Sequence, residues 1–191
     1  MLELGLLTPG GKARWDEFVA SQPSSTVFHL SAWADVMASA FGHKTHYITL
    51  TDGARLRGVL PLVELKSRLF GHSLVSTAFC VGGGPLATDD ESRTQLLQEA
   101  ERLGRKLSVG FVELRDSPAA QGWTGKSDLY AGFERELIVD EAQNLLQIPR
   151  KQRAVVRKAL EGDFRVTTDK DLDTFYALFS RTMRDHGTPA F

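Results

Sequence analysis

Three strand-forming segments joined by two tight turns constrain the fold of this 191-residue chain more than any other feature. Residues 46–51 and 56–66 flank Asp52-Gly53, a dipeptide that is typical of tight hairpin turns. Phe70-Gly71 then turns the chain into a third segment, residues 73–80. The pattern predicts a three-strand meander. Because Pro61 lies inside the second arm and cannot donate a ladder hydrogen bond, we expect that arm to lie at a sheet edge or to carry a bulge.

Helices and further strands surround this meander in the sequence. A short helix is expected over residues 16–20, and Ser31 is the expected N-cap of a second, apolar-faced helix that runs to Phe41. Residues 89–107 have acids in the first turn, bases in the last and leucines along one face, as a helix requires. Residues 109–114 and 133–139 alternate like strands. The prediction is an α/β (α+β) domain over residues 1–140, with a mixed, mostly antiparallel sheet.

Residues 141–191 differ in charge from the rest of the chain. They hold 9 basic and 7 acidic residues, against 14 and 17 in residues 1–140. The expected order is a short helix to Gln147, a break at Pro149, a basic helix to Leu160 with Gly162 as its C-cap, a strand over residues 164–168, and a final helix. The apolar face of that helix consists of Leu172, Phe175, Phe179 and Met183.

Composition excludes several classes of protein. With 42% hydrophobic and 25% charged residues and a net charge of −1, the chain is not disordered, collagen-like or dominated by one sign of charge. A single cysteine, Cys80, excludes an internal disulfide and a cysteine-rich zinc site, and it fits a reducing compartment. Residues 69–88 lack charged side chains, but their polar residues and glycines favour a buried strand and loop over a membrane span. No targeting signal is visible, so we expect a cytoplasmic protein.

The basic helix is the first candidate binding site. Its five positive charges, which no acid interrupts, lie on one side of the helix: Arg150, Lys151, Arg153, Arg157 and Lys158. Two interpretations remain open. The helix is either a solvated surface whose acidic partners come from another segment, or a binding site for a phosphate-rich donor or substrate.

A glycine run is the second candidate. Gly82, Gly83 and Gly84 follow a strand and precede a helix, which is where phosphate-binding loops occur. Against this, the next helix opens with three acids, and no Lys or Arg lies between Cys80 and Arg93. Close backbone packing or a bulge is the alternative interpretation.

No residue is nominated as catalytic from the sequence. The five histidines, at positions 29, 43, 46, 72 and 186, lack metal-ligand spacing, so no metal site is predicted. Cys80 ends an apolar strand and is expected to be a core residue. Glu64, Glu113 and Asp116 could serve as bases, yet nothing in the sequence pairs them with a partner.

Several sequence blocks together resemble the FemAB-related transferases, in particular the branch associated with exosortase and PEP-CTERM exopolysaccharide systems. The most specific block is residues 148–160, which begins Ile148-Pro149-Arg150-Lys151-Gln152-Arg153, and residues 185–189 (Asp-His-Gly-Thr-Pro) follow it. Supporting blocks are residues 28–33, residues 58–62 and the Gly82-Gly83-Gly84-Pro85 run. The resemblance extends over most of the chain.

This resemblance implies a GNAT-like fold, normally duplicated in tandem, and transfer of an acyl or aminoacyl group to an amine. The implied donor is an aminoacyl-tRNA or an acyl-CoA, with no tightly bound cofactor, and the implied acceptor belongs to the cell envelope or to exopolysaccharide assembly. Because the family continues well beyond the Gly-Thr-Pro motif, residues 141–191 are expected to begin a second, truncated GNAT-like domain. The chain alone is then expected to be inactive. Two alternatives stay open: an anion-binding module for RNA or acidic membranes that uses the basic helix, and a coenzyme A-dependent N-acetyltransferase.

Overall fold

The computed structural model describes residues 1–115, 120–127, 131–168 and 170–190. It divides into two compact units, residues 1–126 and residues 127–191. The sequence-based domain boundary near residue 140 stays a prediction. None of the helices in the described ranges combines the length and the apolar character that a bilayer crossing needs.

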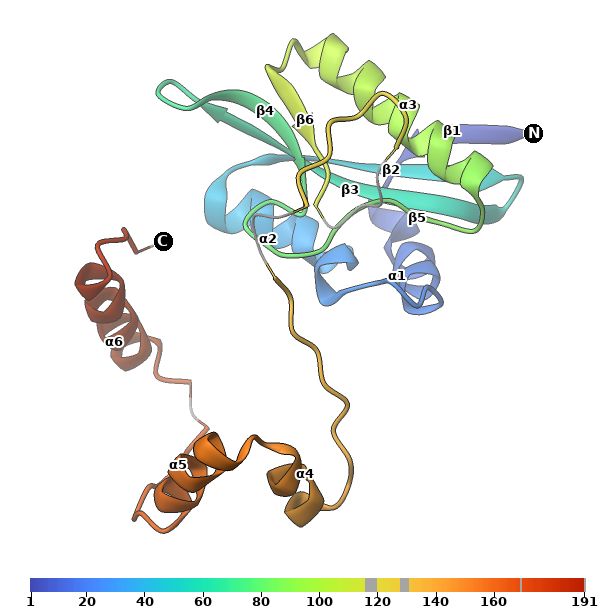
Figure 1. Ribbon diagram of the computed structural model, residues 1–191. Helices are drawn as coiled ribbons and strands as arrows, with labels where there is room; N and C mark the ends of the chain where they lie inside the picture. The colour runs from blue at the N-terminus through green and yellow to red at the C-terminus, as the bar shows by residue number, and fades with distance from the viewer. Residues whose placement is uncertain (116–119, 128–130, 169, 191) are drawn as a thin grey trace. The chain divides into compact units, whose positions relative to one another are not determined.

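A mixed sheet forms the centre of the first unit (Figure 1). Its strand order is β1-β2-β3-β4-β6, and the short β5 pairs with β3. All neighbours are antiparallel except β4 and β6, which are parallel. The bounds are β1 Leu2–Leu6, β2 Lys44–Asp52, β3 Arg55–Ser67, β4 Gly71–Ser76, β5 Leu86–Ala87 and β6 Phe111–Glu113. The expected meander and the mixed, mostly antiparallel sheet are therefore confirmed. The third strand is shorter than expected, because β4 ends at Ser76 and residues 77–80 form a turn, so Cys80 does not end a strand.

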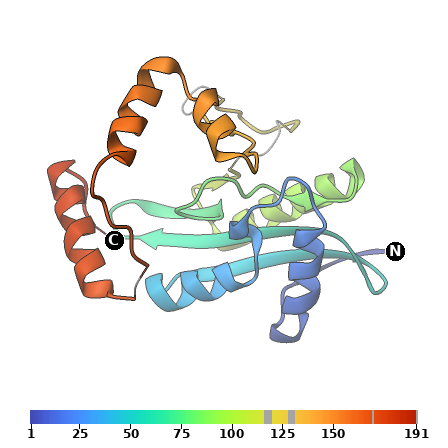
Figure 2. The ribbon, with the colours of Figure 1, turned by 90° about the horizontal axis from the view of Figure 1, so that it is seen from below.

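Helices cover both faces of this sheet. The long helix α3 (Asp90–Leu107) lies on one face, while α1 (Lys12–Ala20) and α2 (Ala32–Phe41) lie on the other (Figures 1 and 2). Two short 3-10 helices, η1 (Pro9–Gly11) and η2 (Val27–His29), precede α1 and α2. Leu96 and Ala100 of α3 are fully buried against one side of the sheet, and Trp15 of α1 is fully buried against the other. Burial of these apolar faces drives the three-layer packing.

Polar side chains at the N-termini of α3 and α2 have different roles. The Asp89 carboxylate accepts the Ser92 N–H at 2.8 Å and starts α3. Ser31 occupies the N-cap position of α2, as expected, but its hydroxyl donates to Asp16 at 2.8 Å instead of capping the helix. That bond ties the start of α2 to α1.

Of the two expectations for the strand that contains Pro61, the edge position is wrong, because β3 is interior, and the bulge is confirmed, although it does not lie at Pro61 itself. The bulge in β3 falls earlier, where Leu50 pairs with Gly58 and Thr51 with Leu56. Pro61 is tolerated because β3 changes its neighbour beside it: β5 pairs with residues 58–59, and the β4 ladder begins at Leu62. Its carbonyl still accepts the Thr77 N–H at 3.2 Å.

The second unit holds α4 (Glu141–Gln147), α5 (Arg150–Leu160) and α6 (Leu172–Asp185), as the sequence predicts. The expected C-cap of α5 is wrong, because Glu161 and not Gly162 occupies that position. None of these helices contains a buried residue. The predicted strands at Phe133–Val139 and Phe164–Thr168 are wrong, since neither segment pairs with a strand. A strand needs a ladder partner, and the apolar side chains Phe133, Val139 and Val166 of these segments are almost fully exposed.

Candidate functional site

The carboxyl ends of β4 and β6 mark the first candidate site. These parallel strands are joined by a crossover through α3, and ligands in open α/β sheets bind beyond the carboxyl ends of such strands. The chain beyond β4 forms a turn and the glycine run, and Arg115 follows β6. We call residues 77–84 together with Arg115 the loop site.

The turn at the loop site has a strained backbone. Thr77 and Phe79 both have positive φ, of 42° and 66°, which side-chain-bearing residues rarely adopt. The Cys80 N–H donates to the Thr77 carbonyl at 3.1 Å, and the Arg115 guanidinium donates to the Cys80 carbonyl at 2.8 Å. Each left-handed residue costs about 1–2 kcal/mol, and such strain clusters at functional sites.

The glycine run is packed tightly behind this turn. Gly82, Gly83 and Gly84 are buried; the Thr77 hydroxyl donates to the Gly82 carbonyl at 2.6 Å, and His29 Nε2 lies 3.1 Å from the Gly84 carbonyl. A Cβ at Gly83 would overlap the Thr77 side chain. The carbonyls of Gly82 and Gly84 therefore take part in contacts within the fold. In the described part of the chain, however, no acceptor is recorded for the three N–H groups, so the donor-binding role of this run stays a prediction.

The other groups near the loop site offer little nucleophilic character. Burial raises the pKa of the Cys80 thiol, which keeps it protonated near neutral pH. Glu113, one of the three candidate bases, pairs with Arg115 at 2.9 Å. Asp116, another, lies outside the described residues. His29 has a structural role, because it bonds to both Thr26 and Gly84, and burial lowers its pKa.

Glu64, the third candidate base, joins two histidines across three strands. Its carboxylate oxygens lie 3.0 Å from His46 Nε2 and 2.9 Å from His72 Nε2. Hydrogen bonds from His46 first, and then from His72, lower the pKa of Glu64 despite its partial burial. The carboxylate is therefore ionised, and each of its two oxygens already has a histidine partner. Within the described ranges, no group of three or more His, Cys, Asp or Glu side chains is arranged to hold a metal ion.

The predicted cationic face of α5 is exposed in the second unit. Arg150, Lys151, Arg157 and Lys158 are exposed, and no ion pair among the described residues includes them. Arg153 differs, because its guanidinium donates to the Ile148 carbonyl at 2.8 Å and to the Leu146 carbonyl at the end of α4. Four of the five predicted binding residues are thus available to a ligand, and the fifth fixes the α4–α5 junction.

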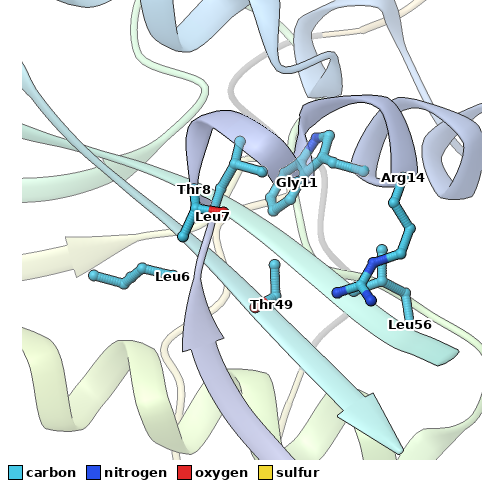
Figure 3. A pocket seen from close by; sticks show the side chains of 8 residues that line it. Leu6, Leu7, Thr8, Gly11, Arg14, Thr49 and Leu56 are labelled. Carbon is cyan, nitrogen blue, oxygen red and sulfur yellow. The ribbon is translucent and has the colours of Figure 1, made fainter. Parts of the chain in front are cut away.

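Two hollows complete the candidate sites. One of about 50 Å³ lies where β1 ends and α1 begins, beside Thr8, Gly11, Arg14 and Thr49 (Figure 3), and it is far smaller than a typical substrate site. The other, of about 560 Å³, lies in the second unit. It is lined mainly by α4 and by Arg135, Leu137 and Leu160.

Comparison with solved structures gives an extensive match to FemX. The crystal structure of FemX superposes on 99% of this chain with a TM-score of 0.66 and 18% sequence identity. The match shows the fold. The chain spans 52% of the FemX chain, so it corresponds to about half of that protein.

Two further structures are similar at lower scores. A transcriptional regulator from Bacillus halodurans C-125 covers 72% of this chain with a TM-score of 0.48 and 10% identity, and 100% of that chain is matched. A GNAT family acetyltransferase from Staphylococcus aureus subsp. aureus USA300_TCH1516 covers 71%, with a TM-score of 0.45 and 11% identity, and 98% of that chain is matched. Neither protein-family models nor curated protein sequences give a match to this chain.

Proposed function

We propose that this chain is part of an acyl or aminoacyl transferase of FemAB type. It would move the group from a phosphate-bearing donor to an amine on a cell-envelope or exopolysaccharide-related acceptor. The observation that carries the proposal is the FemX fold followed over 99% of the chain. The link to exopolysaccharide assembly and a cytoplasmic location rest on the sequence alone.

The reaction makes modest demands on the protein. The acceptor nitrogen forms a C–N bond with the carbonyl carbon, and the C–O or C–S bond to the donor breaks. The amine proton passes through solvent or a carboxylate to the leaving oxygen or sulfur, which departs as the alcohol or thiol. Alignment of the amine with the ester or thioester and stabilisation of the oxyanion supply most of the rate. Glu64 is held by two histidines and Glu113 by Arg115, and we assign neither as the base.

The donor would be held by its phosphates. Arg150, Lys151, Arg157 and Lys158 form a cationic face that lacks acidic partners among the described residues, and repulsion between like charges is relieved when an anion binds. The Gly82–Gly84 amides are a separate candidate anion site within the first unit. Aminoacyl-tRNA and acyl-CoA both present the required phosphates.

A non-catalytic anion-binding module is the alternative that the exposed face of α5 favours. Such a module would bind RNA or an acidic membrane without turnover. An N-acetyltransferase that uses coenzyme A is the further alternative, in which coenzyme A would bind and tRNA would not.

Salt-dependent binding tests the proposal. Dissociation constants of the full chain for tRNA and for coenzyme A are measured from about 50 to 200 mM salt, beside the R150A/K151A/R157A/K158A variant. Loss of four phosphate contacts should weaken tRNA binding and reduce the log–log salt slope by up to about 3. The matched control, R55A/K66A/R68A/K106A, removes four exposed charges from the first unit and should leave the slope close to that of the unsubstituted chain.

Three outcomes distinguish the proposed transferase from the two alternatives. Unchanged binding of both donors in the α5 variant contradicts the role of α5. Equal α5-dependent binding to nonspecific RNA and to phosphatidylcholine vesicles containing phosphatidylserine favours the module. Salt-dependent binding of coenzyme A alone favours the acetyltransferase.

A further inference from the structure

The outer edge of β1 has no strand beside it in the part of the chain that the structure describes. β1 lies at one end of the strand order and pairs with β2 alone (Figure 1). Leu4 pairs with Leu50, a residue of the core beneath α3, so the leucines at alternate positions of β1 lie on the α3 face of the sheet. They are incompletely covered, since Leu4 is 45% exposed and Leu6 is 58% exposed. An uncovered apolar strand at a sheet edge is a template for pairing with another strand.

The backbone groups on this open edge belong to the leucines. The Leu7 N–H donates to the Tyr47 carbonyl at 2.8 Å, which makes these two residues a hydrogen-bonded pair of the β1–β2 ladder. Such pairs alternate along an antiparallel ladder, so Glu3 and Gly5 also bond toward β2. The residues whose N–H and carbonyl groups point away from β2 are therefore Leu2, Leu4 and Leu6.

The sequence of β1 is complementary to itself in an antiparallel arrangement. With Leu4 opposite Leu4 of a second copy, Leu2 of each copy lies opposite Leu6 of the other, and each of these three pairs can exchange two hydrogen bonds. A centre one residue to either side leaves only two such pairs. Because residues directly opposite point to the same face, the leucines of both copies would pack side by side.

The other face of β1 favours the same register. With Leu4 at the centre, Glu3 of one copy lies opposite Gly5 of the other, so no like charges meet and no side chains clash. A centre at Glu3 would instead place two carboxylates directly opposite each other, which is destabilising. Backbone bonding, apolar contact and charge therefore agree on a single pairing.

We propose that two copies of this chain form a two-fold dimer through β1, with Leu4 at the axis. The same edge serves both copies, so the assembly closes at two and does not extend into a fibre. β1 lies at the opposite end of the strand order from β4 and β6, so pairing at β1 does not cover the loop site. The inference is independent of the proposed transferase function.

Sedimentation velocity of the full chain tests the dimer. The concentration should span about 10 to 500 µM, because an interface this small is expected to be weak. The unsubstituted chain should shift toward twice the monomer mass as the concentration rises. Leu4→Lys places two ammonium groups at the axis and should weaken the dimer roughly 10-fold. The matched control, Leu69→Lys, makes the same change at an 87% exposed leucine between β3 and β4 and should leave the dimer intact.

Cysteine cross-linking tests the register without adding charge. Residues in a hydrogen-bonded antiparallel pair have Cα atoms about 5.5 Å apart, which a disulfide can bridge. Leu4→Cys should therefore form a covalent dimer when it is oxidised with glutathione disulfide. The two copies of residue 2 would lie about 13 Å apart, four residues along the strand, so Leu2→Cys should not. The unsubstituted chain is the background control, because its single cysteine, Cys80, is buried.

The results that support and overturn the dimer differ clearly. A dimer that Leu4→Lys weakens and Leu69→Lys does not, with cross-linking at residue 4 but not at residue 2, supports the proposal. A chain that stays monomeric at the highest concentration overturns it and leaves the edge to an extended segment of another protein. A dimer that Leu4→Lys does not weaken lies on another surface and also overturns it. Equal cross-linking at residues 2 and 4 overturns the two-fold register.

Discussion

Substituting Gly83 by alanine is the sharpest test of how the loop site is built. The new Cβ would overlap Thr77 Oγ1 and Cγ2 and lie 2.6 Å from Thr77 Cβ, and it would also hold a φ of 155°. Overpacking costs about 1–3 kcal/mol, and the unfavourable backbone conformation adds about 1–2 kcal/mol. We expect the free energy of unfolding to fall by about 2–5 kcal/mol. For a unit of this size, each kcal/mol lowers Tm by roughly 4 °C.

A double-mutant cycle isolates the contact. All three atoms that the new Cβ meets belong to the Thr77 side chain, so Thr77→Gly removes the overlap and also relieves the positive φ of residue 77. In the Thr77→Gly background, Gly83→Ala should lower the free energy of unfolding only by the cost of its backbone conformation. The coupling free energy between the two substitutions is then about 1–3 kcal/mol. The assay is urea unfolding followed by tryptophan fluorescence, since all three tryptophans (Trp15, Trp33 and Trp123) lie in the first unit.

Additive effects within about 0.5 kcal/mol would refute this packing model. A Gly83→Ala variant of unchanged stability that has lost donor binding would instead show that the glycine run serves the ligand rather than the fold.

Three other predictions concern stability and pH. Glu64→Gln should lower the free energy of unfolding by about 1–3 kcal/mol at pH 7, because it weakens two charge-assisted bonds from His46 and His72. The pKa of Glu64 is lowered in the folded chain. Its contribution to the free energy of unfolding is therefore complete above pH ~4.3 and is lost as the pH falls through the lowered pKa. When the free energy of unfolding is measured against pH in the acid range, it should fall less steeply in the variant. Arg153→Ala should free the last carbonyls of α4 and increase limited proteolysis at residues 146–149, whereas Arg157→Ala should not. Asp89→Ala should lower the urea midpoint more than Asp89→Asn, because asparagine can still cap α3.

Elements with strong local signals were predictable from the sequence. Asp52-Gly53 fixes the β2–β3 hairpin, and Asp89 together with the leucine spacing fixes α3. β1 and β5 were not predicted, since β1 is short and mostly exposed and β5 has only two residues. The alternation of residues 133–139 indicated a strand, but alternation supplies no ladder partner, and that prediction is wrong.

Among the candidate sites too, features set by local sequence patterns were predictable, and features set by contacts between distant segments were not. The cationic face of α5 follows from helical periodicity, so the sequence predicts it, whereas the capping role of Arg153 depends on how α4 meets α5. The pairing of Glu64 with His46 and His72 depends on the registers of two ladders, which no local pattern encodes. The left-handed backbone of Thr77 and Phe79 at the loop site is likewise not predictable, because no propensity rule places such a conformation at residues with side chains.

The proline in β3 has a consequence for the loop site. Pro61 stands opposite Thr77 and accepts its N–H, but it has no N–H with which to return the bond. The Thr77 carbonyl is therefore left without a ladder donor, and the Cys80 N–H takes that place and closes the turn that carries Phe79. The absent N–H of Pro61 thus leaves a single hydrogen bond between Pro61 and Thr77, and it leaves the Thr77 carbonyl free to accept the first hydrogen bond of the turn. Any residue with an N–H at position 61 would compete with Cys80 for that carbonyl. The shape of the turn at the loop site is therefore encoded sixteen residues before Thr77, in an interior strand of the sheet.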